Sequence, residues 1–194
     1  MYSNLTSLIL KRQDFRDDDL LVTIYSRESG KLTLIARGAK KILSKLAGHL
    51  EPVSLSLLNA ASGKSIDQLT GASMVKSYAR IKADLMKTAA AVWFLNLIDE
   101  LTLENHEDER IFHLAEKYLD FLEKKEEDYQ IAELSAGFKL LALLGLNPSE
   151  KADLKFKKEI DFIVGNSIDK IYQDKNIKEK IKALNKIFAQ ELKK

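Results

Sequence analysis

Apolar and polar positions alternate in short runs along the first eighty residues, and turn residues separate the runs. Alternation with period two, rich in β-branched residues, favours strands over helices. We predict five strands, at about 6–10, 20–25, 32–37, 53–57 and 67–78. Five short strands in so short a stretch indicate a small closed barrel.

The connection between the third and fourth predicted strands, residues 38–51, is longer than the others. A five-stranded OB barrel often carries a helix at this connection, so its length agrees with an OB fold. An SH3-like barrel also fits the pattern.

The pattern changes to helical periodicity after about residue 80, where glycine becomes scarce. Helices are predicted over about 81–103, 109–124, 129–144 and 177–192, whereas 150–176 gives no clear pattern. The first is apolar on nearly every side, which indicates burial. Its predicted core face consists of Ile81, Leu85, Val92 and Leu95. We therefore predict an α+β protein, with a five-stranded OB-fold barrel over residues 1–79 and an all-helical domain over residues 80–194.

Composition excludes several kinds of site. The 194 residues contain no cysteine, so a disulfide and a zinc site with thiolate ligands are both ruled out, and the three histidines are not at metal-ligand spacing. The most apolar run, residues 89–98, is about half of the ~20 residues that cross a bilayer. The N-terminal residues do not have the pattern of a signal peptide. We expect a cytoplasmic protein with no cofactor, no metal and no membrane segment.

Two local motifs resemble parts of enzyme sites. Gly63-Lys64-Ser65 matches the end of a phosphate-binding loop, but Leu58 stands where that loop requires glycine. Asp17-Asp18-Asp19 suits either a metal site or a polar turn between two strands, and we favour the turn. A nucleophile elbow is also missing from the sequence, so we expect a protein that is not an enzyme.

Charge is distributed unevenly along the chain. Residues 1–80 hold 12 Lys and Arg against 7 Asp and Glu, a net charge of +5, whereas residues 81–194 have a net charge of −3. Four cations follow the third strand within nine residues, with no acidic residue among them, and three more lie at neighbouring strand ends. A basic barrel loop of this kind suits phosphate contacts that give affinity without sequence specificity. The four are Arg37, Lys40, Lys41 and Lys45, and the three are Lys11, Arg12 and Lys31.

The basic cluster belongs to a longer run that resembles the RecO family of bacterial DNA repair proteins. The resemblance covers about residues 8–57 and is most specific at residues 36–41 (ARGAKK) and 44–52 (SKLAGHLEP). Residues 140–148 (LLALLGLNP) are similar to a segment of the family's helical domain.

The resemblance implies a recombination mediator with an N-terminal OB barrel and a helical C-terminal domain. Such a protein binds single- and double-stranded DNA, anneals complementary strands, and works with RecR and the single-stranded DNA-binding protein to load RecA onto gapped DNA. The family's basic residues carry over onto Arg37, Lys40, Lys41 and Lys45, and beyond these onto Lys11, Arg12 and Lys31. A nucleoid-associated location follows from this role.

The resemblance also implies that the acidic, apolar-ended tail of the single-stranded DNA-binding protein docks on the helical domain. That domain has a net negative charge, so an acidic tail needs a local basic pocket. Candidate cations for this pocket are Lys82, Lys87, Arg110, Lys117 and Lys139.

The sequence departs from the family pattern after residue 148. Many relatives carry a four-cysteine zinc element there, whereas this chain has residues 151–165 without cysteine and is shorter than a typical member. We therefore expect no structural zinc. Three other functions stay open: an RNA-binding OB protein acting on structured RNA, an enzyme whose barrel delivers substrate, and an adaptor whose barrel binds protein.

Overall fold

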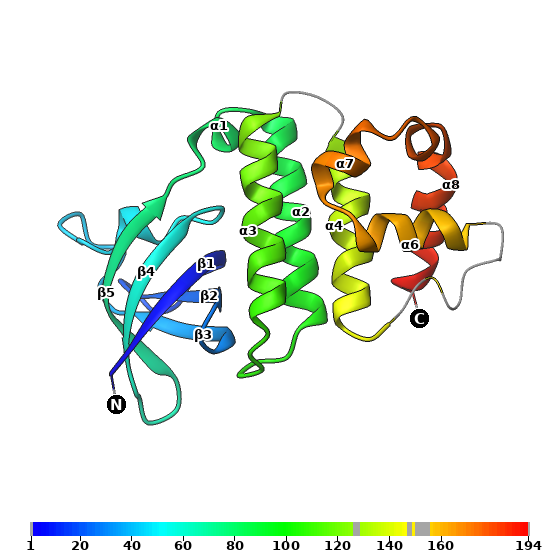
Figure 1. Ribbon diagram of the computed structural model, residues 1–194. Coiled ribbons are helices and arrows are strands. Elements are labelled where there is room, and N and C mark those ends of the chain that lie inside the picture. Colours follow the sequence, from blue (N-terminus) through cyan, green and yellow to red (C-terminus); the bar gives the residue numbers. More distant parts are fainter. Residues whose placement is uncertain (1, 126–128, 147–148, 150–155, 194) are drawn as a thin grey trace.

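A computed structural model describes residues 2–125, 129–146, 149 and 156–193. Within them, a β-barrel at the left of Figure 1 is followed by a group of helices at the right, and the long helices α2 (Leu85–Leu101) and α3 (Glu109–Lys124) lie next to the barrel. The strands are β1 (Tyr2–Asp14), β2 (Leu20–Ser26), β3 (Gly30–Ala36), β4 (Leu55–Ala61) and β5 (Asp67–Lys76). They close in the order β1-β2-β3-β5-β4, with β4 pairing back onto β1. This closed five-stranded barrel confirms the predicted OB fold and the α+β class.

The connection from β3 to β4 differs from the prediction. Its only regular element is one short 3-10 turn, η1 (Ala47–His49). Strand β4 begins at Leu55, two residues later than predicted, and it ends four residues later. The cause is Val53, whose φ of 56° lies in the left-handed region and interrupts the extended backbone.

The described helices are α1 (Ala79–Lys82), α2 (Leu85–Leu101), α3 (Glu109–Lys124), α4 (Tyr129–Leu143), α6 (Lys157–Gly165), α7 (Ile168–Gln173) and α8 (Lys175–Glu191). The predicted helices at 109–124, 129–144 and 177–192 are confirmed to within two residues. In the stretch 150–176, which gave no clear pattern, the described part contains α6 and α7. Among the described residues, none of the helices is both long enough and apolar enough to cross a membrane.

The predicted helix at 81–103 is confirmed over Leu85–Leu101 as α2, but it does not continue back to residue 81, because the chain breaks at Asp84. Its backbone is extended, and its carboxylate accepts hydrogen bonds from the amides of Met86 and Lys87, which caps a new helix. A break resets the helical phase, so the predicted core face fails as well. Leu85 is 83% exposed and Val92 is exposed, whereas Ile81 and Leu95 are buried as predicted.

Two apolar clusters hold the molecule together. One fills the barrel, with Ile9, Val22 and Leu34 at its centre. The other lies among the helices and includes barrel residues as well, Leu8 and Tyr25 among them. The barrel and the helices therefore share a continuous buried interface, which fixes their relative positions.

Candidate functional site

The basic loop, residues 37–50, joins β3 to β4 on the side of the barrel away from α4 and the C-terminal helices (Figure 1). Its base is firmly attached. The amide of Gly38 donates to Asp19 Oδ1 at 2.8 Å, and the amide of Lys40 donates to the carbonyl of Asp18 at 2.9 Å. Ala39 and Leu50 are buried. The loop is thus presented on a fixed base.

The predicted cations of this loop differ in how far they are compensated. Lys40 Nζ lies 2.9 Å from Asp14 Oδ2, and Lys41 Nζ lies 3.7 Å from Asp18 Oδ2. Arg37 and Lys45 are exposed, and neither has a counter-ion within the described part of the chain. Free cations of this kind are the ones that bind phosphate at no cost of breaking an existing pair.

Arg12 adds a third free cation near the same end of the barrel. It lies on β1, two residues before Asp14. The main chain of Asp14 pairs with Leu20 of β2, and Leu20 in turn pairs with Ala36 of β3, which directly precedes Arg37. Arg12 is exposed and has no ion pair among the described residues. The structure therefore brings Arg12, Arg37, Lys40, Lys41 and Lys45 to one end of the barrel.

Lys11 and Lys31 lie elsewhere, against helix α2. Lys11 Nζ is 2.5 Å from Asp99 Oδ2, while Lys31 Nζ donates to the main-chain carbonyl of Asp99 at 2.5 Å. The side chain of Lys31 is only 12% exposed. Both cations face the helices and share the carboxylate of Asp99, so they do not join the basic loop.

The acidic turn at Asp17-Asp18-Asp19 is a structural partner of the basic loop. Asp19 accepts a hydrogen bond from the amide of Gly38. Asp18 accepts one from the amide of Lys40 and pairs with the side chain of Lys41, so both residues hold the basic loop. Within the described ranges, no group of three or more His, Asp or Glu side chains is arranged to hold a metal ion. The geometry favours a polar turn at this position over a metal site.

Tyr25, Tyr78 and Phe15, the aromatic residues of the barrel region whose side chains the structure describes, contribute little to its surface. Tyr25 and Tyr78 are buried at 0% and 4% exposure. Burial raises the pKa of Tyr25 to about 12, aided by the nearby charge of Asp108. Phe15 is half-buried, and the guanidinium of Arg16 lies 5.0 Å from its ring centre. Neither tyrosine is free to stack on a base.

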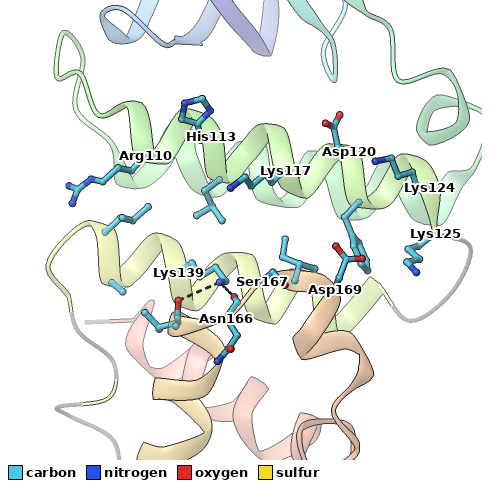
Figure 2. Close-up of a pocket in the computed structure, with 17 residues that line it drawn as sticks. Arg110, His113, Lys117, Asp120, Lys124, Lys125, Lys139, Asn166, Ser167 and Asp169 are labelled. Atoms are coloured by element: carbon cyan, nitrogen blue, oxygen red, sulfur yellow. Dashed lines mark hydrogen bonds between the residues drawn. The ribbon is translucent and has the colours of Figure 1, made fainter.

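A groove of about 1070 Å³ opens between α3, α4 and the segment from α6 to α7. Figure 2 shows four of its cations along α3 and at its end, with Lys139 of α4 opposite them and pointing between the helices. Leu114, Phe121 and Ile168 are among its apolar residues. The cations are Arg110, Lys117, Lys124, Lys125 and Lys139, and the acids are Asp120 and Asp169. A basic groove with an apolar floor suits an acidic ligand that has an apolar end.

Lys139 is the most sequestered cation of the groove. Burial lowers its pKa, and the charge of Lys117 lowers it further. Its ammonium group donates to the carbonyls of Val164 and Asn166. Lys117 and Lys124 are exposed and have no counter-ion in the described part of the helices. An anion bound here would relieve the mutual repulsion of these cations.

The sequence identified part of this groove. Arg110, Lys117 and Lys139 converge there, as a pocket for the tail requires. Lys82 instead pairs with Glu51 at 3.3 Å, and Lys87 is buried at 5% exposure. Lys124 and Lys125 were missed. A spacing of seven residues puts Arg110, Lys117 and Lys124 on one face of α3, and this signal was present in the sequence.

Comparison with known proteins gives matches along nearly the whole chain. A family model described as Recombination protein O N terminal matches residues 1–78, and one described as Recombination protein O C terminal matches residues 82–185. Among curated relatives named DNA repair protein RecO, that of Rubrobacter xylanophilus is 30% identical over 73% of this chain and 56% of its own length. That of Symbiobacterium thermophilum is 28% identical over 75% of this chain and 58% of its own length. That of Myxococcus xanthus is 36% identical over 62% of this chain and 50% of its own length. The chain thus spans between half and two thirds of the length of these relatives.

Proposed function

The chain belongs to the RecO family of DNA repair proteins, and on that premise we propose that it is a non-enzymatic recombination mediator that binds single- and double-stranded DNA. The observation that carries the proposal is the anchored basic loop, whose Arg37 and Lys45 are exposed without a counter-ion among the described residues. Its role is to bind phosphates of either strand.

The proposed mechanism needs no catalytic residue. Two complementary strands repel one another because each carries a charge on every phosphate. Cations that bind both strands at once lower this repulsion and release counterions, so pairing becomes easier. Annealing of complementary strands would follow from this neutralisation. The proposed role also includes loading RecA onto gapped DNA together with RecR, as family membership suggests.

The groove supports the second half of the proposal, docking of the acidic tail of the single-stranded DNA-binding protein. Lys117 and Lys124 suit the acidic residues of the tail, and Leu114 and Phe121 suit its apolar end. A terminal carboxylate would form charge-assisted hydrogen bonds with the cations. The groove and the basic loop lie on different parts of the molecule, so the protein could bind DNA and the tail at the same time.

Binding and annealing assays with the intact chain test the proposal. Affinity for single-stranded DNA, duplex DNA and single-stranded RNA of equal length is measured against salt, and annealing is followed with and without the single-stranded DNA-binding protein. Arg37→Ala with Lys45→Ala should flatten the log-affinity against log-salt slope by roughly 0.7–0.9 for each phosphate that the protein no longer neutralises. Lys182→Ala with Lys186→Ala, exposed on α8, is the matched control.

Three outcomes would overturn the proposal. An intact chain that binds no DNA is not a mediator of this kind. Much tighter binding to RNA than to DNA would favour the RNA-binding alternative. If the Arg37→Ala and Lys45→Ala double variant keeps the wild-type salt slope, as the control variant should, the phosphate contacts lie away from the basic loop.

A further inference from the structure

Two aliphatic side chains project from the tip of the basic loop. Ile42 is 102% exposed and Leu43 is 93% exposed, the highest values among the large apolar side chains of the described residues. Cations surround them in sequence, and no acidic residue lies between Arg37 and Leu50. An isolated exposed apolar residue is ordinary, but two adjacent ones inside a basic loop form a distinct feature.

Local folding does not explain these residues. Ile42 and Leu43 are the two central residues of a β-turn that the amide of Ser44 closes on the carbonyl of Lys41 at 2.9 Å. Glycine, proline, asparagine, aspartate and serine are the residues that stabilise such turns, and a β-branched isoleucine has no advantage there. A departure from local preference at an exposed position points to a role in function.

The turn is held away from the barrel by the anchored base of the basic loop. A second turn, in which the amide of Lys41 donates to the carbonyl of Gly38 at 3.2 Å, comes directly before it. Leu46, which follows it, packs against the core of the barrel. Both ends of the tip are therefore fixed while the two side chains face solvent.

We infer that Ile42 and Leu43 form an apolar wedge that inserts between the unstacked bases of single-stranded DNA while Arg37 and Lys45 hold the flanking phosphates. This inference rests on the proposed DNA binding. Charge complementarity selects the occupant, because a single strand combines a polyanionic backbone with apolar base faces. With Tyr25 and Tyr78 buried, these tyrosines offer the bases no stacking surface. Apolar side chains are known to insert between the base steps of duplex DNA, and the unstacked bases of a single strand would admit them without the cost of separating stacked bases.

The wedge gives binding a component that salt does not screen. Contacts with bases release no counterions, so they add affinity without steepening the salt dependence. Bases in an intact duplex are already stacked and must be separated before a side chain enters. The wedge therefore favours single strands over duplex.

The test uses a double variant of the full chain that carries both Ile42→Ser and Leu43→Ser, and compares it with the wild type. Affinity for single-stranded DNA should fall about tenfold, since two aliphatic side chains that the bases would partly bury are removed. The salt slope should stay unchanged, and duplex affinity should fall less. Leu85→Ser with Met86→Ser, two exposed apolar residues on α2, is the matched control and should bind as the wild type does. Ile42→Trp gives a direct readout, because its fluorescence should be quenched when oligothymidine binds.

Each result separates the inference from the proposed function. If the wild type binds DNA and the serine variant binds equally well, the wedge is refuted and the mediator proposal stands. If the wild type binds no DNA, both are refuted. A serine variant with wild-type DNA affinity that no longer binds phosphatidylglycerol vesicles, to which the wild type does bind, would refute the wedge and assign the tip to a membrane surface.

Discussion

Lys31 of β3 and Asp99 of α2 are joined by two contacts. The ammonium group of Lys31 donates to the main-chain carbonyl of Asp99 at 2.5 Å and lies 3.6 Å from its carboxylate oxygen Oδ1. Lys11 of β1 reaches the other carboxylate oxygen, Oδ2. One acidic residue on a helix thus holds two cations of the barrel, and both lie at the interface where the barrel packs on the helices.

Asp99→Ala should destabilise the protein by about 2 kcal/mol, because it removes the carboxylate that pairs with Lys11 and Lys31 and leaves the largely covered Lys31 only its hydrogen bond to the main-chain carbonyl. The free energy of unfolding in urea measures this effect. Glu100→Ala is the matched control, since Glu100 is an exposed acid on the same helix, and it should change stability by less than about 0.5 kcal/mol. Equal effects of the two variants would mean that the Asp99 contacts do not stabilise the interface.

Lys11 and Lys31 should also contribute less to DNA binding than the cations of the basic loop. Replacing Lys31 with methionine keeps most of its apolar contacts and removes its charge. Its salt slope for single-stranded DNA should stay near the wild-type value, whereas that of Arg37→Ala should fall by roughly 0.7–0.9. A larger change for Lys31 than for Arg37 would contradict this ranking.

The fold could be predicted wherever its signal is local. Period-two alternation found all five strands, and a spacing of 3.6 residues found α3 and α4 almost to the residue. The errors arose where one residue changed the backbone. Asp84 caps a new helix, and Val53 adopts a left-handed conformation in spite of its β-branched side chain. Neither choice follows from the periodicity of its neighbours. The cap at Asp84 is a single-residue signal inside an otherwise helical pattern, and the positive φ of Val53 runs against the preference of a β-branched residue.

The candidate site could be predicted only in part, for a related reason. The basic loop is contiguous in sequence, so its cations could be identified together. The contacts of Lys11 and Lys31 with Asp99 join residues 88 and 68 positions apart, and no local pattern indicates them. In the groove, the face of α3 is visible in the sequence, but Lys139 and Asn166 arrive through the packing of other helices.

Asp18→Asn should strengthen DNA binding. It frees Lys41, whose ammonium group lies 3.7 Å from the Asp18 carboxylate, and removes a negative charge beside the proposed phosphate contacts. Both side chains are more than half exposed, so fold stability should hardly change. Affinity for single-stranded DNA should rise a few-fold at low salt and approach the wild-type value at high salt, where exposed charges are screened. Asp161→Asn, exposed on α6, is the control and should leave affinity unchanged.

Tyr25 should make the protein sensitive to alkali. Its hydroxyl donates to the carbonyl of Asp108 at 3.2 Å, and burial raises its pKa from 10.0 to about 12. Below pH 10 the residue is protonated in both the folded and unfolded states, so its contribution is fully present. Between pH 10 and pH 12 the unfolded state ionises first, and stability is lost. The urea midpoint of the wild type should therefore fall more steeply over this range than that of Tyr25→Phe. Parallel curves would show that Tyr25 does not titrate at the interface.

The groove should bind an acidic peptide with an apolar C-terminal residue, and the pH dependence should identify Lys139. Burial and the charge of Lys117 lower the pKa of Lys139 below its usual 10.5, and a bound carboxylate favours the charged form. Affinity should therefore fall as pH rises through this lowered pKa.

Fluorescence anisotropy of a labelled peptide with the full chain measures this affinity, and Lys139→Met should flatten the dependence. Lys117→Glu with Lys124→Glu should weaken binding about tenfold or more, because both cations are reversed at once. Amidation of the C-terminus of the peptide removes the carboxylate and should also weaken binding. Lys182→Glu with Lys186→Glu changes charge by the same amount on α8, outside the groove, and should have little effect. If both charge-reversed proteins bind the peptide equally well, the groove is not its docking site, and long-range charge alone accounts for any attraction.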